Sequence, residues 1–336
     1  MTSLPYELSQ AIEMEVSKID LSLFSQALLE LSLSYRNNEK VFITSLARRL
    51  AYIGVRLPAT YSAILSTLLE IKNNSPSTQL TSLLDLGAGP GTTLWAALTA
   101  WPEISKVTLV ERDREMISLG KTLASNATNP FIHSAQWLNL DLTNKQSLSQ
   151  HDLVVISYAL GEMDSATKEN ALLQAWQATE KVLVIIEPGT VKGFHNILLA
   201  RDFLILSEAN ILAPCPHKNV CPIAEGDWCH FSSRVERSSF HRRAKGGVLS
   251  YEDEKFSYII ASKELASSNY SRVIRHPLKR PGHIHLDLCT NNGLSRVTIS
   301  QKNKDAYKLA RKLSWGDIWE ETLKETLKET LKEIQE

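Results

Sequence analysis

Apolar residues recur at helical spacing through the first 75 residues of the chain. In LSLFSQALLELSLSY at 21–35 and YSAILSTLLEI at 61–71, an apolar residue returns every three or four positions, which is typical of an amphipathic helix. Pro58 stands just before the second stretch, where proline suits the first turn of a helix. The pattern predicts an N-terminal helical region that ends before NNSPSTQ at 73–79.

From residue 81 the chain changes to short apolar runs separated by helical stretches. The runs expected to contain strands are, in order, SLLDL, KVTLVERD, SAQWLNLDL, HDLVVISYAL and KVLVIIEPG. Strands that alternate with helices form βαβ units and a mostly parallel sheet. The sequence therefore predicts an α/β fold with a Rossmann-like sheet.

A second change follows residue 190. The helical stretch FHNILLARDFLILSEANI leads into a loop with three cysteines, and short charged runs such as HIHLDLCT and SRVTISQK then predict a small mixed or antiparallel sheet. Three ETLK units near the end predict an exposed helix. The expected division is a helical region at 1–75, a Rossmann-like domain at 76–205, a cysteine-bearing, basic α+β module at 206–318 and a terminal helix at 319–336.

Composition adds little to this pattern, with 43% hydrophobic and 22% charged residues as in an ordinary globular protein. The stretch MTSLPYELSQAIEMEV carries acids and has no basic start before an apolar run, so it does not resemble a signal or transit peptide. No apolar run reaches the roughly 18 residues of a membrane span. We therefore expect a cytoplasmic location of the bacterial type and no membrane contact.

Charge is unevenly distributed, although the net charge is zero. Residues 234–312 hold 17 lysines and arginines against 7 aspartates and glutamates. A basic block of this size indicates contact with a phosphate-rich polymer or, equally, an ordinary solvated face.

The glycine-rich string DLGAGPG lies at 85–91, between an expected strand and an expected helix. Gly87, Gly89 and Gly91 allow a tight turn and close approach to a ligand, and the helix that follows points free N–H groups at that ligand. Glu111 ends the next strand, 26 residues after Asp85, where an acidic side chain can bind ribose hydroxyls. These features predict a nucleotide-type site.

LDLGAGPG also resembles motif I of the methyltransferases that depend on S-adenosylmethionine. This resemblance implies that Asp141 faces the adenine and that Tyr158 lies in the substrate-side wall, so the expected S-adenosylmethionine site comprises Asp85, Gly87, Gly89, Gly91, Glu111, Asp141 and Tyr158. The stretch SYALGEMD at 157–164 differs from the NPPY-type loop of amino-methylating enzymes. No catalytic residue is therefore assigned.

Four cysteines form the second candidate site. Cys215, Cys221 and Cys229 lie within fifteen positions, and Cys289 follows further on. Four thiolates suit a [4Fe–4S] cluster. Zinc remains open as the alternative, bound by all four cysteines or by three of them with His217 or His230.

The string CPHKNVCPIAEGDWCHF, followed by YEDEKFSY, resembles the methyltransferase-like assembly factors of the mitochondrial small ribosomal subunit and their bacterial relatives. RLPATYSA at 56–63, EPG at 187–189 and WGD at 315–317 fit the same family in the expected order. The resemblance implies a methyltransferase domain with a cysteine-bearing module, an iron–sulfur cluster on Cys215, Cys221, Cys229 and Cys289, and small-subunit rRNA or an immature small ribosomal subunit as partner.

Three functions are consistent with these features: an rRNA methyltransferase, a non-catalytic assembly factor that keeps the fold, and a redox or iron sensor whose RNA binding depends on the cluster. The enzyme is the leading expectation. The basic residues expected to bind rRNA phosphates flank the cysteines along the chain; they are Arg234, Arg237, Arg242, Arg243, Lys245, Arg272, Arg275, Lys279 and Arg280.

Overall fold

The computed structural model describes residues 2–36, 43, 45–238, 240–242, 249–264 and 270–320. Its helices are α1 (Tyr6–Val16), α2 (Leu21–Arg36), α3 (Leu46–Ala51), η1 (Tyr52–Arg56), α4 (Leu57–Asn74), α5 (Thr92–Ala100), α6 (Arg114–Ala124), α7 (Pro130–His133), η2 (Leu160–Glu162), α8 (Ser165–Ala178), α9 (Val191–Leu206) and α11 (Lys304–Ala310). The strands are β1 (Ser82–Leu86), β2 (Lys106–Glu111), β3 (Gln136–Asn139), β4 (His151–Ser157), β5 (Thr179–Pro188), β6 (Asn210–Ala213), β7 (Phe231–Glu236), β8 (Tyr251–Ser262), β9 (Ser271–Val273), β10 (Leu278–Arg280), β11 (His283–Thr290), β12 (Gly293–Ser300) and β13 (Ile318–Trp319).

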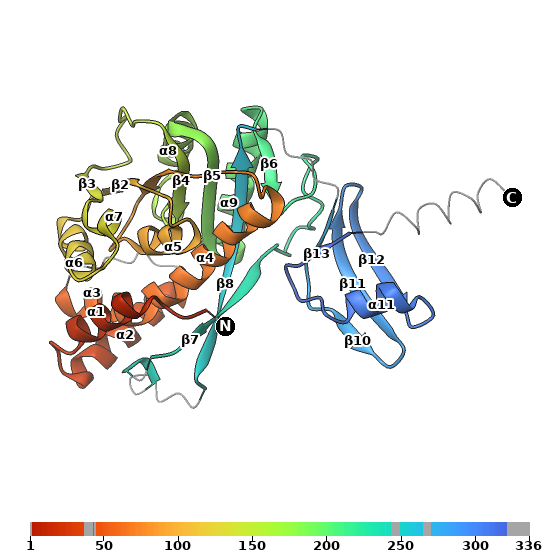
Figure 1. The fold of residues 1–336 in the computed structure, drawn as a ribbon, viewed down its shortest axis with the longest axis horizontal. Coiled ribbons are helices and arrows are strands. Elements are labelled where there is room, and N and C mark those ends of the chain that lie inside the picture. The colour runs from red at the N-terminus through yellow and green to blue at the C-terminus, as the bar shows by residue number, and fades with distance from the viewer. Residues whose placement is uncertain are drawn as a thin grey trace, which may run out of the picture.

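A large sheet forms the centre of the molecule, with strand order β3-β2-β1-β4-β5-β8-β6 and β7 paired to β8 (Figure 1). The strands β1 to β5 are parallel to their neighbours, whereas β8 runs antiparallel to both β5 and β6. The order reverses between β1 and β4, which is the switch point of a doubly wound sheet. The predicted α/β class and Rossmann-like sheet are confirmed.

The large sheet continues past residue 205, where the sequence pattern placed a domain boundary. The residues of β6, β7 and β8 fall within the expected C-terminal module at 206–318 but belong to this sheet. The physical reason is that Ile259, Ile260 and Ala261 of β8 are fully buried between neighbouring strands, and such a strand reads as apolar whichever sheet it joins. The proposed boundary therefore has to move beyond β8.

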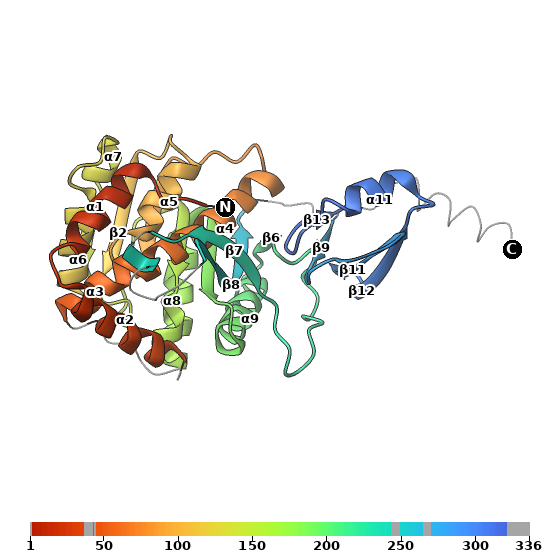
Figure 2. The same cartoon turned by 90° about the horizontal axis from the view of Figure 1, so that it is seen from below.

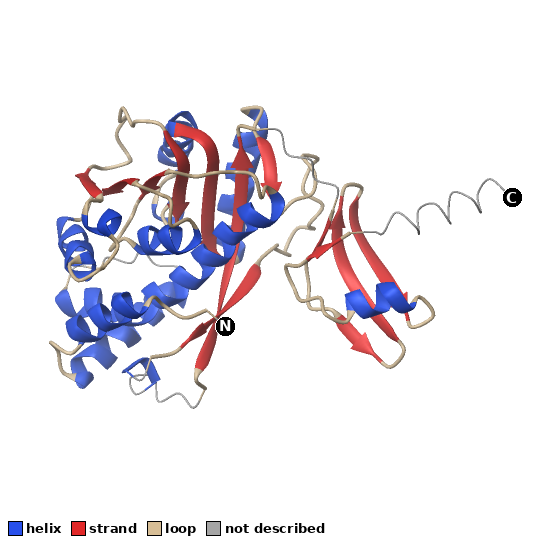
Figure 3. Cartoon of the chain, in the orientation of Figure 1, coloured by secondary structure: helices blue, strands red, loops and turns tan. Residues whose placement is uncertain are grey.

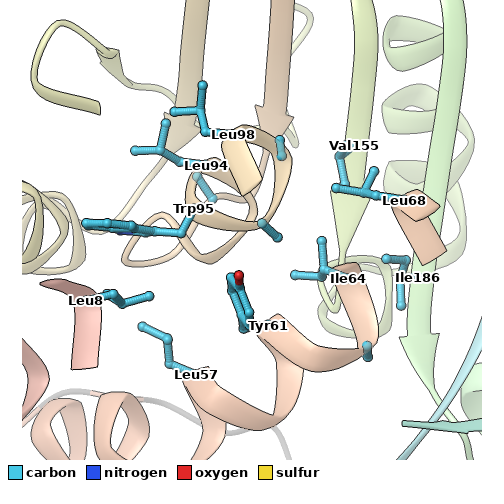
Figure 4. Close-up of a cluster of buried hydrophobic side chains, with 14 of the residues drawn as sticks. Leu8, Leu57, Tyr61, Ile64, Leu68, Leu94, Trp95, Leu98, Val155 and Ile186 are labelled. Carbon is cyan, nitrogen blue, oxygen red and sulfur yellow. The ribbon is translucent and has the colours of Figure 1, made fainter. Parts of the chain in front are cut away.

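Helices cover both faces of the large sheet (Figure 3). On one face, α4 and α5 pack against the strands in one apolar cluster that includes Tyr61, Ile64, Trp95, Val155 and Ile186 (Figure 4). On the other face α8 and α9 cover an apolar layer of their own. This packing fixes the carboxyl ends of β1, β2 and β4, where the glycine-rich turn lies.

A smaller antiparallel sheet stands beside the main body (Figures 1 and 2), with strand order β10-β11-β9-β13 and β12 paired to β11. Its own core lies under α11 and includes Val273, Ile284, Leu286 and Ile299. The ETLK helix expected after residue 320 lies outside the described residues. Within the described part of the chain, no helix is both long and apolar enough to cross a membrane.

Candidate functional site

The glycine-rich turn connects β1 to α5 at the switch point of the large sheet. Gly87, Gly89 and Gly91 all have positive φ angles, of 81°, 55° and 84°, a conformation that residues with a side chain rarely adopt. The N–H groups of Gly87 and Ala88 donate to the carbonyl of Val110 at 2.9 and 3.0 Å. The turn is thereby held against the end of β2.

Glu111 joins the turn to the next strand. Its Oε2 accepts a hydrogen bond from the N–H of Gly89 at 2.8 Å, and its Oε1 accepts one from the N–H of Asp113 at 2.8 Å. A Cβ placed on Gly89 would meet no atom within 4 Å. The structure thus brings the predicted glycines and Glu111 together around open space.

Asp85 lies beneath the turn and is fully buried. Neither carboxylate oxygen has a hydrogen-bond partner among the described residues. Burial raises the pKa of Asp85 to about 7; the nearby Thr93 hydroxyl opposes this shift and the charge of Glu111 adds to it. An unpartnered buried carboxyl next to a backbone turn is a strong candidate for contact with a ligand or a bound water.

Asp85 predicts a pH dependence of stability. The folded chain keeps the Asp85 proton up to about pH 7, whereas the unfolded chain loses it near pH 4. Between these values the folded state binds more protons, so stability falls as pH rises from about 4 to 7 and then levels off. Asp85→Asn is expected to stabilise the ligand-free protein at pH 8 by on the order of 1–3 kcal/mol, and much less at pH 5.

Urea unfolding at pH 5 and pH 8 measures this difference. Asp287→Asn is the control, because the pKa of Asp287 is lowered, chiefly by its hydrogen bonds to Arg296. An Asp85→Asn gain that is equal at both pH values would contradict the assignment.

Asp141 and Tyr158 follow the third and fourth strands, as expected. Asp141 Oδ1 accepts from the N–H of Thr143 at 2.9 Å. Tyr158 has a positive φ of 57°, and its hydroxyl donates to Glu254 Oε1 at 3.3 Å. A non-glycine residue keeps this backbone conformation only where the surrounding packing holds it.

Sequence reasoning did not find the partners of Tyr158. Arg56 forms a bidentate ion pair with Glu254, at 3.0 and 2.9 Å, so one carboxylate serves both Arg56 and Tyr158. Burial, with the charge of Glu254, raises the pKa of Tyr158 well above its usual value. Arg56 and Glu254 stand 198 positions apart, and only folding brings them to the end of β4.

Glu187, at the end of β5, is 1% exposed. It accepts from the N–H of Leu160 at 3.1 Å and from Asn196 Nδ2 at 2.8 Å. Burial raises its pKa to about 7 against these hydrogen bonds. Glu187 therefore fixes the backbone after β4 and offers no evident acid–base role.

The four cysteines come from two parts of the fold, Cys215, Cys221 and Cys229 from the loop between β6 and β7 and Cys289 from β11. Burial raises the pKa of Cys289 to about 12, and neighbouring Cys215 and Cys221 add to the shift. The pKa of Cys229 is raised well above its usual value, by burial and then by the other three thiols. The folding of the chain thus gathers all four predicted thiols.

Four thiols are suitable ligands for a metal centre, but their positions do not form a site for a single ion. No three His, Cys, Asp or Glu side chains among the described residues form a group that could hold one metal ion. His217 Nε2 lies 3.6 Å from the sulfur of Cys289. His230 instead stacks on Trp228, with ring centroids 5.2 Å apart.

Two buried arginines hold the cysteine loop. Arg201, 2% exposed, donates to the carbonyls of His217 and Asn219 at 3.1 and 2.6 Å. Arg272, 1% exposed, donates to the carbonyl of Pro214 at 3.2 Å. Both guanidinium charges oppose the rise in the pKa of Cys289.

The prediction that Arg272 binds RNA needs correction. Its Nη1 donates to Glu70 Oε2 and to the carbonyl of Gly316, each at 2.7 Å. The side chain is enclosed and engaged by three segments, so it presents no surface to a phosphate.

The cysteine loop also docks on the large sheet. Trp228 Nε1 donates to the carbonyl of Gly189 at 3.0 Å, and Ser257 Oγ donates to the carbonyl of Cys229 at 2.7 Å. Gly189 belongs to the EPG string at the end of β5. The loop thus links the large sheet to the small sheet.

The other basic residues are distributed as follows. Three of them form ion pairs: Arg234 with Asp253, Arg237 with Glu252 and Arg275 with Asp227. Lys279 Nζ donates to the carbonyl of Arg311, whereas Arg242 and Arg280 are exposed. Two more, Arg243 and Lys245, lie outside the described residues. The two runs lie on different sheets, β7 on the large sheet and β9–β10 on the small one.

Comparison with known proteins gives a consistent set of matches. A family model described as "Mitochondrial small ribosomal subunit Rsm22" matches residues 46–320. The human mitochondrial ribosome assembly protein METTL17 is 29% identical over 289 residues, which cover 80% of this chain and 62% of that protein. The Rsm22-cox11 tandem protein 2 of Schizosaccharomyces pombe is 29% identical over 90% of this chain and 47% of its own length.

Among solved structures, the magnesium protoporphyrin IX methyltransferase of Synechocystis matches with a TM-score of 0.40 and 12% identity, over 67% of this chain and 86% of that one. The fold assignment rests on the strand order given above and not on this likeness.

The matches overturn the expected bacterial cytoplasmic location. The matching family model describes a mitochondrial protein, and the human and fission yeast relatives are mitochondrial as well. The expected bacterial cytoplasmic location was therefore wrong. This chain spans 62% of the human relative and 47% of the fission yeast one.

Proposed function

Because this chain belongs to the family of the mitochondrial small ribosomal subunit protein Rsm22, we propose that it is an assembly factor of a small ribosomal subunit that binds S-adenosylmethionine and carries a four-cysteine metal centre. The partner is immature small-subunit rRNA or a particle containing it. The observation that carries the proposal is that the cysteine loop docks through Trp228 on Gly189, which follows β5 at the same edge of the large sheet as the glycine-rich turn.

The S-adenosylmethionine site is supported by the glycine turn and its surroundings. Gly89 borders open space, and the carboxylate of Glu111 already lies at its N–H. In this class of sheet, an acidic side chain after the second strand binds the ribose hydroxyls. Asp85 would lie at the methionine part of the cofactor and Asp141 at its adenine. When bound, the cofactor would supply an activated methyl group.

The metal centre is supported by the chemistry of the donor set. Around one zinc ion four thiolates would all lie about 2.3 Å from the same point, and no such convergence exists among the described residues. A [4Fe–4S] cluster is bound by four cysteine thiolates, each on a different iron, and this chain has four cysteines. We therefore favour the iron–sulfur cluster over zinc, with Cys215, Cys221, Cys229 and Cys289 as ligands.

Methyl transfer to rRNA is the second candidate function. Transfer from a sulfonium needs mainly an acceptor held in line, and the glycine turn is intact. At the end of β4, however, the ion pair of Arg56 with Glu254 and the hydroxyl of Tyr158 occupy the wall where an acceptor base would be placed. This arrangement favours an assembly role over catalysis.

Gly89→Arg tests the cofactor site. The new side chain would enter the open space beside the turn, and we expect S-adenosylmethionine affinity to fall at least about 100-fold, equivalent to roughly 2.7 kcal/mol. Gly282→Arg is the matched control, because Gly282 also has a positive φ of 80° and no atom within 4 Å of its Cβ position. Isothermal titration calorimetry of both variants gives the comparison.

Unchanged affinity in Gly89→Arg would place the cofactor elsewhere. The same variants separate the two functions in a methyl-transfer assay on small-subunit particles. Transfer by the wild type that is lost in Gly89→Arg establishes the enzyme, whereas particle binding without transfer supports the assembly factor.

A further inference from the structure

The small sheet has one face covered and one face open. Along β11, Ile284, Leu286 and Leu288 enter the core under α11. Because side chains alternate across a strand, His283, His285, Asp287 and Cys289 lie on the opposite face. The register with β10 and β12 extends this face sideways, pairing Arg280 with His283 and Thr298 with His285.

The cysteine loop covers only one end of this face. Cys289 is buried there next to His217, and Arg272, its cross-strand partner on β9, is buried with it. Further along this face the residues are partly or fully exposed. We name this open part the strip; it comprises Arg280, His283, His285, Arg296 and Thr298.

The side chains of the strip are held in place by one another. The rings of His283 and His285 meet edge to face, with centroids 4.8 Å apart. His285 Nδ1 lies 2.9 Å from Thr298 Oγ1. Arg296 is anchored on Asp287 by two hydrogen bonds, at 2.6 and 2.9 Å, while its side chain stays 63% exposed.

Charge around the strip suits a polyanion. Residues 270–320 contain ten lysines and arginines against four aspartates and glutamates. Asp287, the only acid on β11, is already paired with Arg296. Of these basic residues, Arg280 and Arg296 lie on the strip, so a phosphate chain that crosses this face would meet their positive charge.

The geometry favours an unpaired strand over a duplex. Ring faces on an open sheet can stack on splayed bases, as in the sheet-based modules that bind single-stranded RNA. A duplex keeps its bases stacked inside and would use only the charges. A partner protein with an acidic surface would likewise use the arginines and not the two rings.

We propose that the strip binds an unpaired segment of RNA, with bases against His283 and His285 and phosphates against Arg280 and Arg296. The inference rests on the proposed function, since it names the surface through which the assembly factor would hold rRNA. The strip continues directly into the face that carries Cys289, so the RNA would lie beside the four-cysteine loop.

The test is fluorescence anisotropy with a labelled unpaired RNA oligonucleotide and a labelled duplex RNA, using the full chain with its metal centre. His283→Ala/His285→Ala removes both rings from the strip. We expect affinity for the unpaired oligonucleotide to fall at least about tenfold, because each stacked base contributes substantially. Arg280→Ala is expected to reduce the slope of log K against log salt by about one.

Lys304→Ala/Lys308→Ala is the control, since α11 carries these exposed lysines on the covered side of the same sheet; it should change affinity less than about twofold. Wild-type affinity in the double histidine variant, or equal wild-type affinity for duplex and unpaired RNA, would overturn the inference and leave the assembly function standing. If the wild type binds neither RNA nor small-subunit particles, the proposed function itself is overturned.

Discussion

Replacing Arg272 by methionine is expected to destabilise the protein by about 3–5 kcal/mol, the cost of breaking a buried ion pair on one side. The substitution leaves Glu70 without its cation and removes the donors of the carbonyls of Pro214 and Gly316. These three acceptors belong to α4, the cysteine loop and the turn before β13. The loss should therefore loosen the joint between the two sheets as well as lower the overall stability.

Urea unfolding followed by circular dichroism measures the effect. Arg296→Met is the matched control, because Arg296 forms a similar pair with Asp287 but its side chain is 63% exposed, and exposed pairs contribute about 0–1 kcal/mol. Similar losses in the two variants would show that Arg272 does not have the structural role that its burial indicates.

Replacing Cys289 by serine is expected to reduce bound metal to a background level. The binding free energy of a structural zinc ion is about 10–16 kcal/mol, so one of four ligands represents roughly a quarter of it, or about a hundredfold to a thousandfold in affinity. Of the four proposed ligands, Cys289 alone comes from the small sheet. Its loss should disconnect the loop from β11, whereas the other three cysteines remain together.

Iron, sulfide and zinc analysis of anaerobically purified protein, with a visible spectrum, measures the outcome. His217→Gln is the companion variant, because His217 lies 3.6 Å from the Cys289 sulfur. Four irons in the wild type and in His217→Gln, but none in Cys289→Ser, would support a cluster on four thiolates. One zinc that is lost in His217→Gln would contradict the cluster and assign a mixed cysteine–histidine site.

Local chemistry explains what the sequence could predict. Positive φ angles at Gly87, Gly89 and Gly91 strongly favour glycine, so the string DLGAGPG by itself predicts the turn. The position of Glu111 at the end of the next strand could be predicted because βα units have a regular length. The four cysteines could be singled out as a candidate site because the chain has no others.

Long-range placement explains what the sequence could not predict. Arg272 looked like its basic neighbours, yet folding encloses it against Glu70, 202 positions away. Arg56 belongs to RLPATYSA and Glu254 to YEDEKFSY, but nothing in either string indicates that the two residues form an ion pair. In the same way, the apolar residues of β8 could not show which sheet the strand would join.

The position of β8 has a consequence for how the protein is made. This strand lies between β5 and β6, although it follows both along the chain. Until Ser262 has been synthesised, β5 keeps an unpaired edge, and unpaired edges promote association with other chains. A nascent chain would therefore pass through a stage in which its large sheet is open on one side, and a fragment ending at residue 205 should aggregate during expression.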